Sequence, residues 1–412
     1  METTVLVLVY ALIIITFVFE VWLAILNYQN RNAKIPDVVS DIYNEEEYKK
    51  WLDYNMTNFR FGMILKSINT ILFLALLSFK FFPSINNVAV NSSGNDELQV
   101  VIFMGLYFAV GFVIGLFTSY YDKFVIEEKF GFNKSTKKTF VLDKIKSLLL
   151  TIIFGGGLIY GISALYHNVS SMFFIYTYIS LIAIVLFVNL FYVKLIVPIF
   201  NKLRPLEDSE LKTRIEELAK SVGYEINKIS IIDASKRSTK LNAYFSGFGK
   251  FKQVVLYDTL MEKMSDDEIL AVLAHEIGHS KYKHTLFNLF QTFIMLSLYI
   301  GALVLMLEIP EVSTAFGFEE TNFGFSLILF SVFMSPLMIP VQLITSYFSR
   351  KHEYQADEFA VQNHKKESME TALKVLGKEN FVNLTPHPLY VKLTYSHPPM
   401  VERINAIRKV KD

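Results

Sequence analysis

Long apolar stretches separated by polar segments dominate this chain. A hydrocarbon core of about 30 Å needs roughly 20 mostly apolar helical residues to cross it. Seven stretches qualify, and they run from Val5 to Leu26, Phe61 to Phe82, Val100 to Thr118, Leu148 to Tyr166, Met172 to Val197, Leu286 to Leu307 and Phe323 to Tyr347. The first lacks the basic leader of a secretory signal, so we interpret it as a retained span. The pattern predicts a mainly α, polytopic membrane protein with seven transmembrane helices.

Basic residues gather in alternate segments between these spans. Lys and Arg follow spans one, three, five and seven, beginning with Arg31, Lys34, Lys49, Lys50, Lys123, Lys129, Lys134, Lys137, Lys138, Lys144 and Lys146. The intervening segments, expected as loops from Ser84 to Gln99 and from Glu308 to Asn322, contain neither residue type. Because basic residues mark the cytoplasmic side of a membrane protein, we expect the N-terminus outside and the C-terminus in the cytoplasm.

Several polar residues fall inside the predicted spans, where exposure to hydrocarbon is costly. They are Lys66, Asn69, Asn189, Lys194, Gln291 and Gln342. Two interpretations stay open at this point. These side chains either join neighbouring helices and extend towards the membrane surface, or they face a water-filled cavity between the helices.

The polar segment between spans five and six reads as a mixed α+β domain. An amphipathic helix is expected from Ser209 to Val222 and ends at Gly223. Short β-branched runs predict strands from Ile229 to Asp233 and from Gln253 to Tyr257, with an edge strand from Leu241 to Phe245. Ser265, three residues before Glu268, has capping-box spacing for the next helix.

These features predict four regions along the chain. Residues 1–200 form a membrane domain with spans one to five, and residues 285–348 form spans six and seven. A metallopeptidase domain is divided between residues 201–284 and residues 349–412.

Composition narrows the chemistry of any active site. Of the 412 residues 52% are hydrophobic, the formal net charge is +1, and cysteine is absent. The near-neutral charge gives no indication of nucleic-acid binding. Without cysteine the protein has no disulfide, thiolate zinc site or cysteine nucleophile, so any metal must use His, Asp and Glu.

One short motif indicates metal chemistry. His275-Glu276-Ile277-Gly278-His279 places two imidazoles one helical turn apart on the same face, where both can bind one cation. Catalytic zinc sites use three protein ligands, commonly imidazole and carboxylate, and leave one position for water. The metal acidifies that water, and Glu276 is placed to take its proton during attack on a peptide carbonyl. The plainer alternative is a pair of solvent-facing histidines on a core helix.

A third ligand has to come from elsewhere in the chain. Glu353 is the best candidate, because it follows the last span on the same predicted side as His275. Asp357, one turn further on, can accept the distal N–H of a ligand imidazole and fix its tautomer. His284 and His352 stay open as ligands, although His284 would lie one turn further along its helix and His352 about 100° away from Glu353. A solvated charge cluster beside the membrane would also explain these residues.

Together these motifs resemble the type I CaaX prenyl protease family, which are integral membrane zinc metallopeptidases with seven spans. The resemblance rests on the span count, the length, His275-Glu-Ile-Gly-His279, Glu353-x-x-x-Asp357 and Ser396-His397-Pro398-Pro399. The segment from Phe124 to Thr136 is similar to the family's loop after the third span. Leu241-Asn242-Ala243-Tyr244 is similar to its substrate-binding edge. The motifs occur in the family's order over nearly the whole chain.

The resemblance implies an architecture and a set of roles. The spans would surround an intramembrane chamber, with a zincin-like α+β metallopeptidase domain and one zinc ion per chain at its cytoplasmic end. Asn242, Ala243 and Tyr244 would form the edge to which substrate adds as a strand. His397 and Arg403 would polarise the scissile carbonyl and stabilise the oxyanion. From the residues alone, His397-Pro-Pro is better explained as a turn before a C-terminal helix.

The function expected is zinc-dependent endopeptidase activity near the C-terminus of prenylated CaaX-type or other membrane-associated proteins. The expected partners are a peptide substrate and the bilayer, with no nucleic acid, and we expect a monomer. The location would be the inner membrane of a bacterium or the endoplasmic reticulum of a eukaryote. One alternative is a quality-control protease of a related smaller family without a prenyl requirement, although that family has fewer spans. Another is a transporter or channel with a structural metal, which would need no free Glu276.

Overall fold

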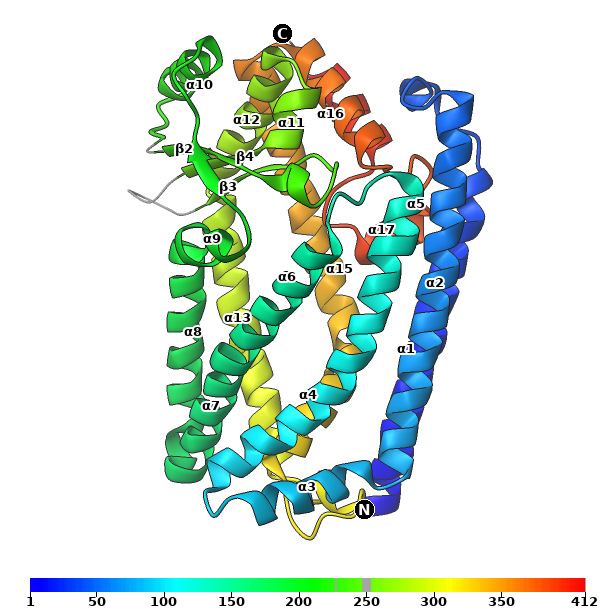
Figure 1. Cartoon of the computed structure of the whole chain (residues 1–412), viewed down its shortest axis with the longest axis vertical. Coiled ribbons are helices and arrows are strands. Elements are labelled where there is room, and N and C mark those ends of the chain that lie inside the picture. Colours follow the sequence, from blue (N-terminus) through cyan, green and yellow to red (C-terminus); the bar gives the residue numbers. More distant parts are fainter. Residues whose placement is uncertain (227, 247–252, 412) are drawn as a thin grey trace.

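The computed structural model describes residues 1–226, 228–246 and 253–411 (Figure 1). Within these residues seven helical segments are long and apolar enough to cross a membrane, the number expected from the sequence. They are Glu2–Asn32, Glu45–Ser78, Asp96–Phe130, Lys137–Asn168, Phe173–Phe200, His284–Leu307 and Phe323–Asn363. The chain termini lie at opposite ends of the molecule in Figure 1, as an odd number of crossings requires.

Several spans are built from more than one helical element. The spans contain α1 (Glu2–Gln29), α2 (Glu45–Ser78), α4 (Asp96–Tyr121), α6 (Lys137–Leu150), α7 (Gly156–Asn168), α8 (Phe173–Phe191), α9 (Val197–Phe200), α13 (His284–Leu307) and α15 (Phe323–Asn363). Short π-helical turns connect these elements. The turn at Asp122–Glu127 joins α4 to α5 (Glu128–Phe130). The turn at Thr151–Gly155 joins α6 to α7, and the turn at Tyr192–Ile196 joins α8 to α9.

The end of the molecule near the N-terminus is closed by helices that the sequence pattern did not predict. The second span ends at Ser78 instead of Phe82, because Lys80 adopts a left-handed conformation and α3 (Phe81–Ser92) begins there. Most of the expected loop from Ser84 to Gln99 is therefore helix. The expected loop from Glu308 to Asn322 also contains a short helix, α14 (Glu311–Thr314). The apolar residues at this turn continue into α3 because they pack into a core, where Phe82 is 1% exposed beside Phe103 and Phe325.

Hollows lie between some of the spans. Only 6 to 22% of the residues in the most apolar window of each span are buried inside the protein, as expected for helices that also face lipid. A hollow of about 280 Å³ lies among α1, α2, α4 and α15, and one of about 470 Å³ lies between α2 and α4. Glu20 lines the first hollow and pairs with Lys66. Lys66 therefore joins α2 to α1, the first of the two interpretations, through an acidic partner that lines a hollow.

A small sheet and a group of helices sit at the other end of the spans (Figure 1). The sheet has the order β1-β2-β4-β3, formed by β1 (Leu203–Pro205), β2 (Lys228–Ile232), β4 (Gln253–Tyr257) and β3 (Ala243–Ser246). β2 and β4 are parallel, and the outer two pairs are antiparallel. The edge position of β3 agrees with the sequence pattern, whereas β1 was not expected.

The helices of this end come from distant parts of the chain. They are α10 (Glu210–Ser221), α11 (Asp258–Lys263), α12 (Asp266–Lys281), α16 (Lys366–Glu379), α17 (Pro388–Thr394) and α18 (Met400–Lys409). One core unites α10, the sheet and α12, and a second unites α12 with α15, α16, α18 and the segment after α1. Trp51, near the start of α2, is buried in the same core and donates from Nε1 to the carbonyl of Phe381. Helix α12 therefore lies at the centre of this end.

Candidate metal centre

Helix α12 carries the paired histidines on a rigid support. Its N-terminus has the expected capping box, in which Ser265 and Glu268 satisfy each other's backbone N–H groups. The helix is buried along most of its length, from Ile269 to Gly278 apart from Glu276. His275 and His279 follow one turn apart, with their ring centroids 4.8 Å apart.

Helix α15 brings the acidic residues to α12. It continues without a break past its apolar part to Asn363, despite Pro336 and Pro340, so Glu353 and Asp357 project from the extension of the last span. The two helices approach closely at Gly278, where a Cβ atom would lie 3.1 Å from both the Cα of Ala356 and the Cβ of Phe359. Only glycine permits this approach without displacing α15.

The three proposed ligands converge on one point. His275 Nε2 and His279 Nε2 are 3.1 Å apart, and oxygens of Glu353 lie 3.5 Å and 3.3 Å from these two atoms. One ligand atom from each residue lies within 4.8 Å of the others. Glu353 is 4% exposed, yet its Oε2 has no hydrogen-bond partner among the described residues. A buried carboxylate oxygen without a partner beside two imidazoles fits a cation, and this donor set suits zinc.

The ring edge of His275 that faces away from the ligand cluster contacts a carboxylate, which is itself paired with a guanidinium. Asp357 Oδ1 lies 2.8 Å from His275 Nδ1, on the ring edge opposite the convergence point. Arg403 from α18 donates from Nε and Nη2 to the two oxygens of Asp357, over 2.9 Å and 2.6 Å. Its Nη1 lies 3.5 Å from Glu353 Oε2, so the guanidinium connects the two carboxylates.

Two further titratable groups face the same space. Glu276 is partly buried between the two histidines on α12, and its desolvation raises the pKa of its carboxyl above the usual range, opposed by His275 and His279. His397 Nε2 lies 3.4 Å from Glu353 Oε1, and its side chain is 63% exposed. Burial against the protein lowers the pKa of the His397 imidazole. Among the residues around the converging ligands, His397 is thus the most accessible to an incoming ligand.

The predicted substrate edge lies beside α12. Strand β3 begins at Ala243 and pairs with β4 on one side only, within the described residues. Asn242 precedes it, accepting the N–H of Tyr257 through its backbone carbonyl. Tyr244 packs its ring against Tyr257. Because hydrogen-bonded positions alternate along an antiparallel pair, the bond between Asn242 and Tyr257 directs the backbone of Asn242 and Tyr244 towards β4 and leaves that of Ala243 facing the free side.

Sequence reasoning missed a residue that limits this edge. The side chain of Asn380, at the C-terminus of α16, accepts the N–H of Leu241 over 2.9 Å and donates to its carbonyl over 3.1 Å. The amide thus occupies both backbone groups that a strand partner would use, and the free edge starts after Leu241. Asn380 is 139 residues from Leu241, and nothing in the sequence indicates that the two residues meet.

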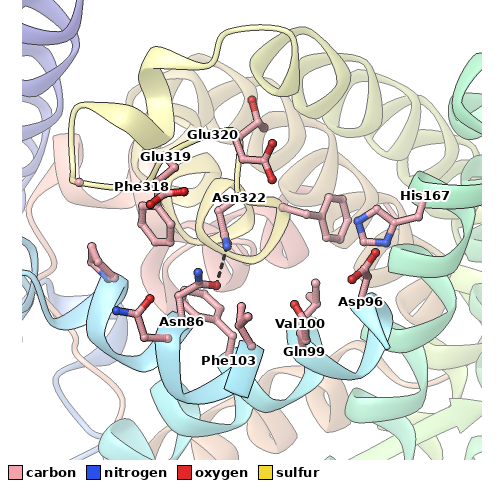
Figure 2. Close-up of a pocket in the computed structure, with 16 residues that line it drawn as sticks. Asn86, Asp96, Gln99, Val100, Phe103, His167, Phe318, Glu319, Glu320 and Asn322 are labelled. Atoms are coloured by element: carbon pink, nitrogen blue, oxygen red, sulfur yellow. Dashed lines mark hydrogen bonds between the residues drawn. The ribbon is translucent and has the colours of Figure 1, made fainter. Parts of the chain in front are cut away.

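A large hollow lies away from this site. It measures about 630 Å³ and lies near the N-terminal end of the molecule, between α3, α4, α7 and the segment after α14 (Figure 2). Asp96, Glu319 and Glu320 line it, and Asn322 donates to Asn86 over 2.8 Å. Its lining contains no Lys or Arg, which continues the charge asymmetry between the two ends of the spans.

Comparisons with known proteins agree with this geometry. Residues 24–202 match the model described as CAAX prenyl protease N-terminal, five membrane helices, and residues 205–411 match peptidase family M48. CAAX prenyl protease 1 of Saccharomyces cerevisiae is 34% identical, over 96% of this chain and 93% of that protein. A homologue from Oryza sativa is 32% identical, over 96% and 95%.

A solved structure is similar over the same extent. The crystal structure of S. mikatae Ste24p superposes with a TM-score of 0.92 at 34% identity, covering 97% of this chain and 98% of that one. The fold comprises seven helices suited to cross a membrane, with a metallopeptidase domain that contains a small sheet. The chain therefore belongs to peptidase family M48, and it is a membrane zinc metalloprotease related to the CAAX prenyl proteases.

Proposed function

We propose that this protein cleaves peptide bonds near the C-terminus of prenylated CaaX-type proteins, with His275, His279 and Glu353 as zinc ligands and Glu276 as general base. The observation that carries the proposal is the convergence of the three ligands within 4.8 Å, beside an edge strand with one free side. Residues 201–284 and 349–412 would form one catalytic unit, joined through the contact of α12 with α15.

The positions of the residues support the following roles. Zinc, when bound, acts as a Lewis acid towards the peptide carbonyl and acidifies water. Glu276 accepts a proton from the attacking water and delivers it to the leaving amine. An extended substrate adds to the strand edge of Asn242, Ala243 and Tyr244, where the backbone of Ala243 faces away from β4. His397 donates to the carbonyl oxygen as negative charge develops, supported by the positive charge of Arg403, and Asp357 orients His275.

The substrate class is supported by the relatives and by the hollows between the spans. The relatives from Saccharomyces cerevisiae and Oryza sativa are named CAAX prenyl protease 1 and a homologue of it, with nearly complete coverage on both sides. The hollows between the spans, among α1, α2, α4 and α15, offer apolar surface for a lipid attached close to the scissile bond. A quality-control protease without a prenyl requirement would use the same zinc chemistry, so the lipid is the feature to test.

Matched peptides that differ only in the prenyl group are expected to be cleaved at different rates. The prenylated CaaX peptide should show the higher kcat/KM, because burial of each lipid methylene contributes about 0.8 kcal/mol. The measurement is zinc-dependent cleavage in detergent micelles or vesicles. Equal kcat/KM values for the two peptides would refute the lipid requirement and leave the peptidase in place.

We further propose a monomer with the metal centre on the cytoplasmic side, in the endoplasmic reticulum of a eukaryotic cell or the inner membrane of a bacterium. Segments rich in Lys and Arg lie at the end that carries the metal centre, which supports this orientation. A tag after Asp412 is expected to be digested by protease added from the cytoplasmic side of sealed vesicles. Digestion only from the opposite side would reverse the topology.

A further inference from the structure

The second histidine ligand has a partner behind it that its spacing in the sequence does not suggest. His279 Nδ1 lies 2.9 Å from His284 Nδ1, and their ring centroids are 5.0 Å apart. His284 Nε2 lies 3.1 Å from Gln355 Oε1 on α15. A continuous line of contacts therefore runs from the metal centre through His279 and His284 to Gln355.

A break between two helices creates this contact. On one continuous helix, five residues leave two side chains about 140° apart, so their rings would not meet. Here α12 ends at Lys281, and α13 starts at His284 after Lys283, whose φ is 60°. A non-glycine residue in this conformation costs about 1–3 kcal/mol. The same break corrects the expectation that His284 lies one turn further along the helix of His279.

The hydrogen atoms on this line can be assigned in only one consistent way. If His279 binds zinc through Nε2, its proton sits on Nδ1 and is donated to His284. His284 Nδ1 must then be the acceptor, so its own proton sits on Nε2. The acceptor for that proton is the carbonyl oxygen of Gln355. Every member of the line is satisfied, and His279 is held in the tautomer that leaves Nε2 free for the metal.

We propose that His284 and Gln355 are positioning residues for zinc binding, acting on His279 as Asp357 acts on His275. This inference rests on the ligand set proposed above. The two ligands would then be oriented by different means, His275 by a charged carboxylate and His279 by a neutral relay. Such partners of ligand histidines set ring orientation and ligand basicity, and their loss typically weakens metal binding about 10–100-fold.

Packing holds the imidazole ring of His284 in place independently of its hydrogen bonds. His284 is 3% exposed, and its ring stacks on His352 with centroids 3.9 Å apart and planes 12° apart. Phe287 also packs edge-on against His352. A ring without nitrogen atoms can satisfy this packing but cannot accept the proton of His279, so shape and hydrogen bonding can be separated by substitution.

The test is zinc affinity of the full chain in detergent, measured by competition with a chelator. We expect His284→Phe, which keeps the stacked ring, to weaken zinc binding about 10–100-fold. His284→Asn keeps an acceptor near the position of Nδ1 and should recover most of that loss. Gln355→Leu should weaken binding, whereas Gln355→Glu retains the acceptor oxygen. His352→Phe keeps the stack without touching the relay, so we expect it to bind zinc as the parent does.

Two further readouts separate positioning from general stability. The rise in the denaturation midpoint on adding zinc should shrink in His284→Phe, while the midpoint of the metal-free protein changes little. The visible spectrum of the cobalt-loaded protein should also shift, because it reports ligand geometry. Parent-like zinc affinity in His284→Phe, or equal losses in the Phe and Asn variants, would overturn the relay. Tight zinc binding by His275→Ala would instead refute the ligand set itself.

Discussion

Glu276→Gln is expected to lower the rate of peptide hydrolysis about 10²- to 10⁴-fold while zinc binding stays close to that of the parent. The amide is nearly isosteric with the carboxylate but cannot accept the proton of the attacking water. Zinc remains because Glu276 is not among the three converging ligands. The measurement combines kcat on a CaaX peptide with the zinc content of the purified protein.

A matched substitution separates this effect from a loss of negative charge near the site. Glu358 lies on α15 next to Asp357 but is exposed, and it interacts with Gln362. Glu358→Gln removes the same charge and should leave kcat within a factor of about two, as surface substitutions usually do. Undiminished turnover by Glu276→Gln would eliminate the proposed base. A loss of zinc in that variant would instead mean that Glu276 supports the metal.

The spans and the motif helix were predictable because their signals are local. Hydropathy over about 20 residues identifies a membrane helix, and the Ser265 capping box fixed the start of α12. The start of α15 was equally clear. Its continuation to Asn363 was not, because the apolar pattern stops about 16 residues earlier while the helix continues on contacts with α12 and α16.

Contacts that depend on chain breaks were beyond the sequence. The contact of His284 with His279 was not predicted, because the pattern gave no sign that the helix breaks after Lys281, at Lys283 with its positive φ. The turn at Lys80, which ends the second span and starts α3, was missed for the same reason. Asn380 acts on Leu241 through the tertiary fold alone. A single sequence gives little indication of a non-glycine residue in the left-handed conformation. It also gives little indication of a side chain that takes the place of a strand partner.

Arg403→Met is expected to destabilise the folded protein by about 3–5 kcal/mol, since it leaves a buried carboxylate without its cation. The guanidinium is 12% exposed and binds both oxygens of Asp357, which is 1% exposed. Zinc affinity should fall as well, because Asp357 would lose the geometry with which it holds His275. Arg403→Lys should recover only part of the stability, because an ammonium cannot form the two parallel hydrogen bonds. The measurement is the denaturant midpoint of the detergent-solubilised protein, with and without zinc.

The same helix supplies the control, because Arg408 makes the same bidentate contact in a different environment. It donates from Nε and Nη2 to Glu370 over 2.9 Å and 2.6 Å, but its side chain is 48% exposed. Arg408→Met should therefore cost at most about 1 kcal/mol. Adding Asp357→Asn to Arg403→Met should restore stability relative to Arg403→Met alone, because the unpaired charge is removed while an acceptor for His275 remains. Equal losses for Arg403→Met and Arg408→Met would contradict a buried ion pair as the support of the metal centre.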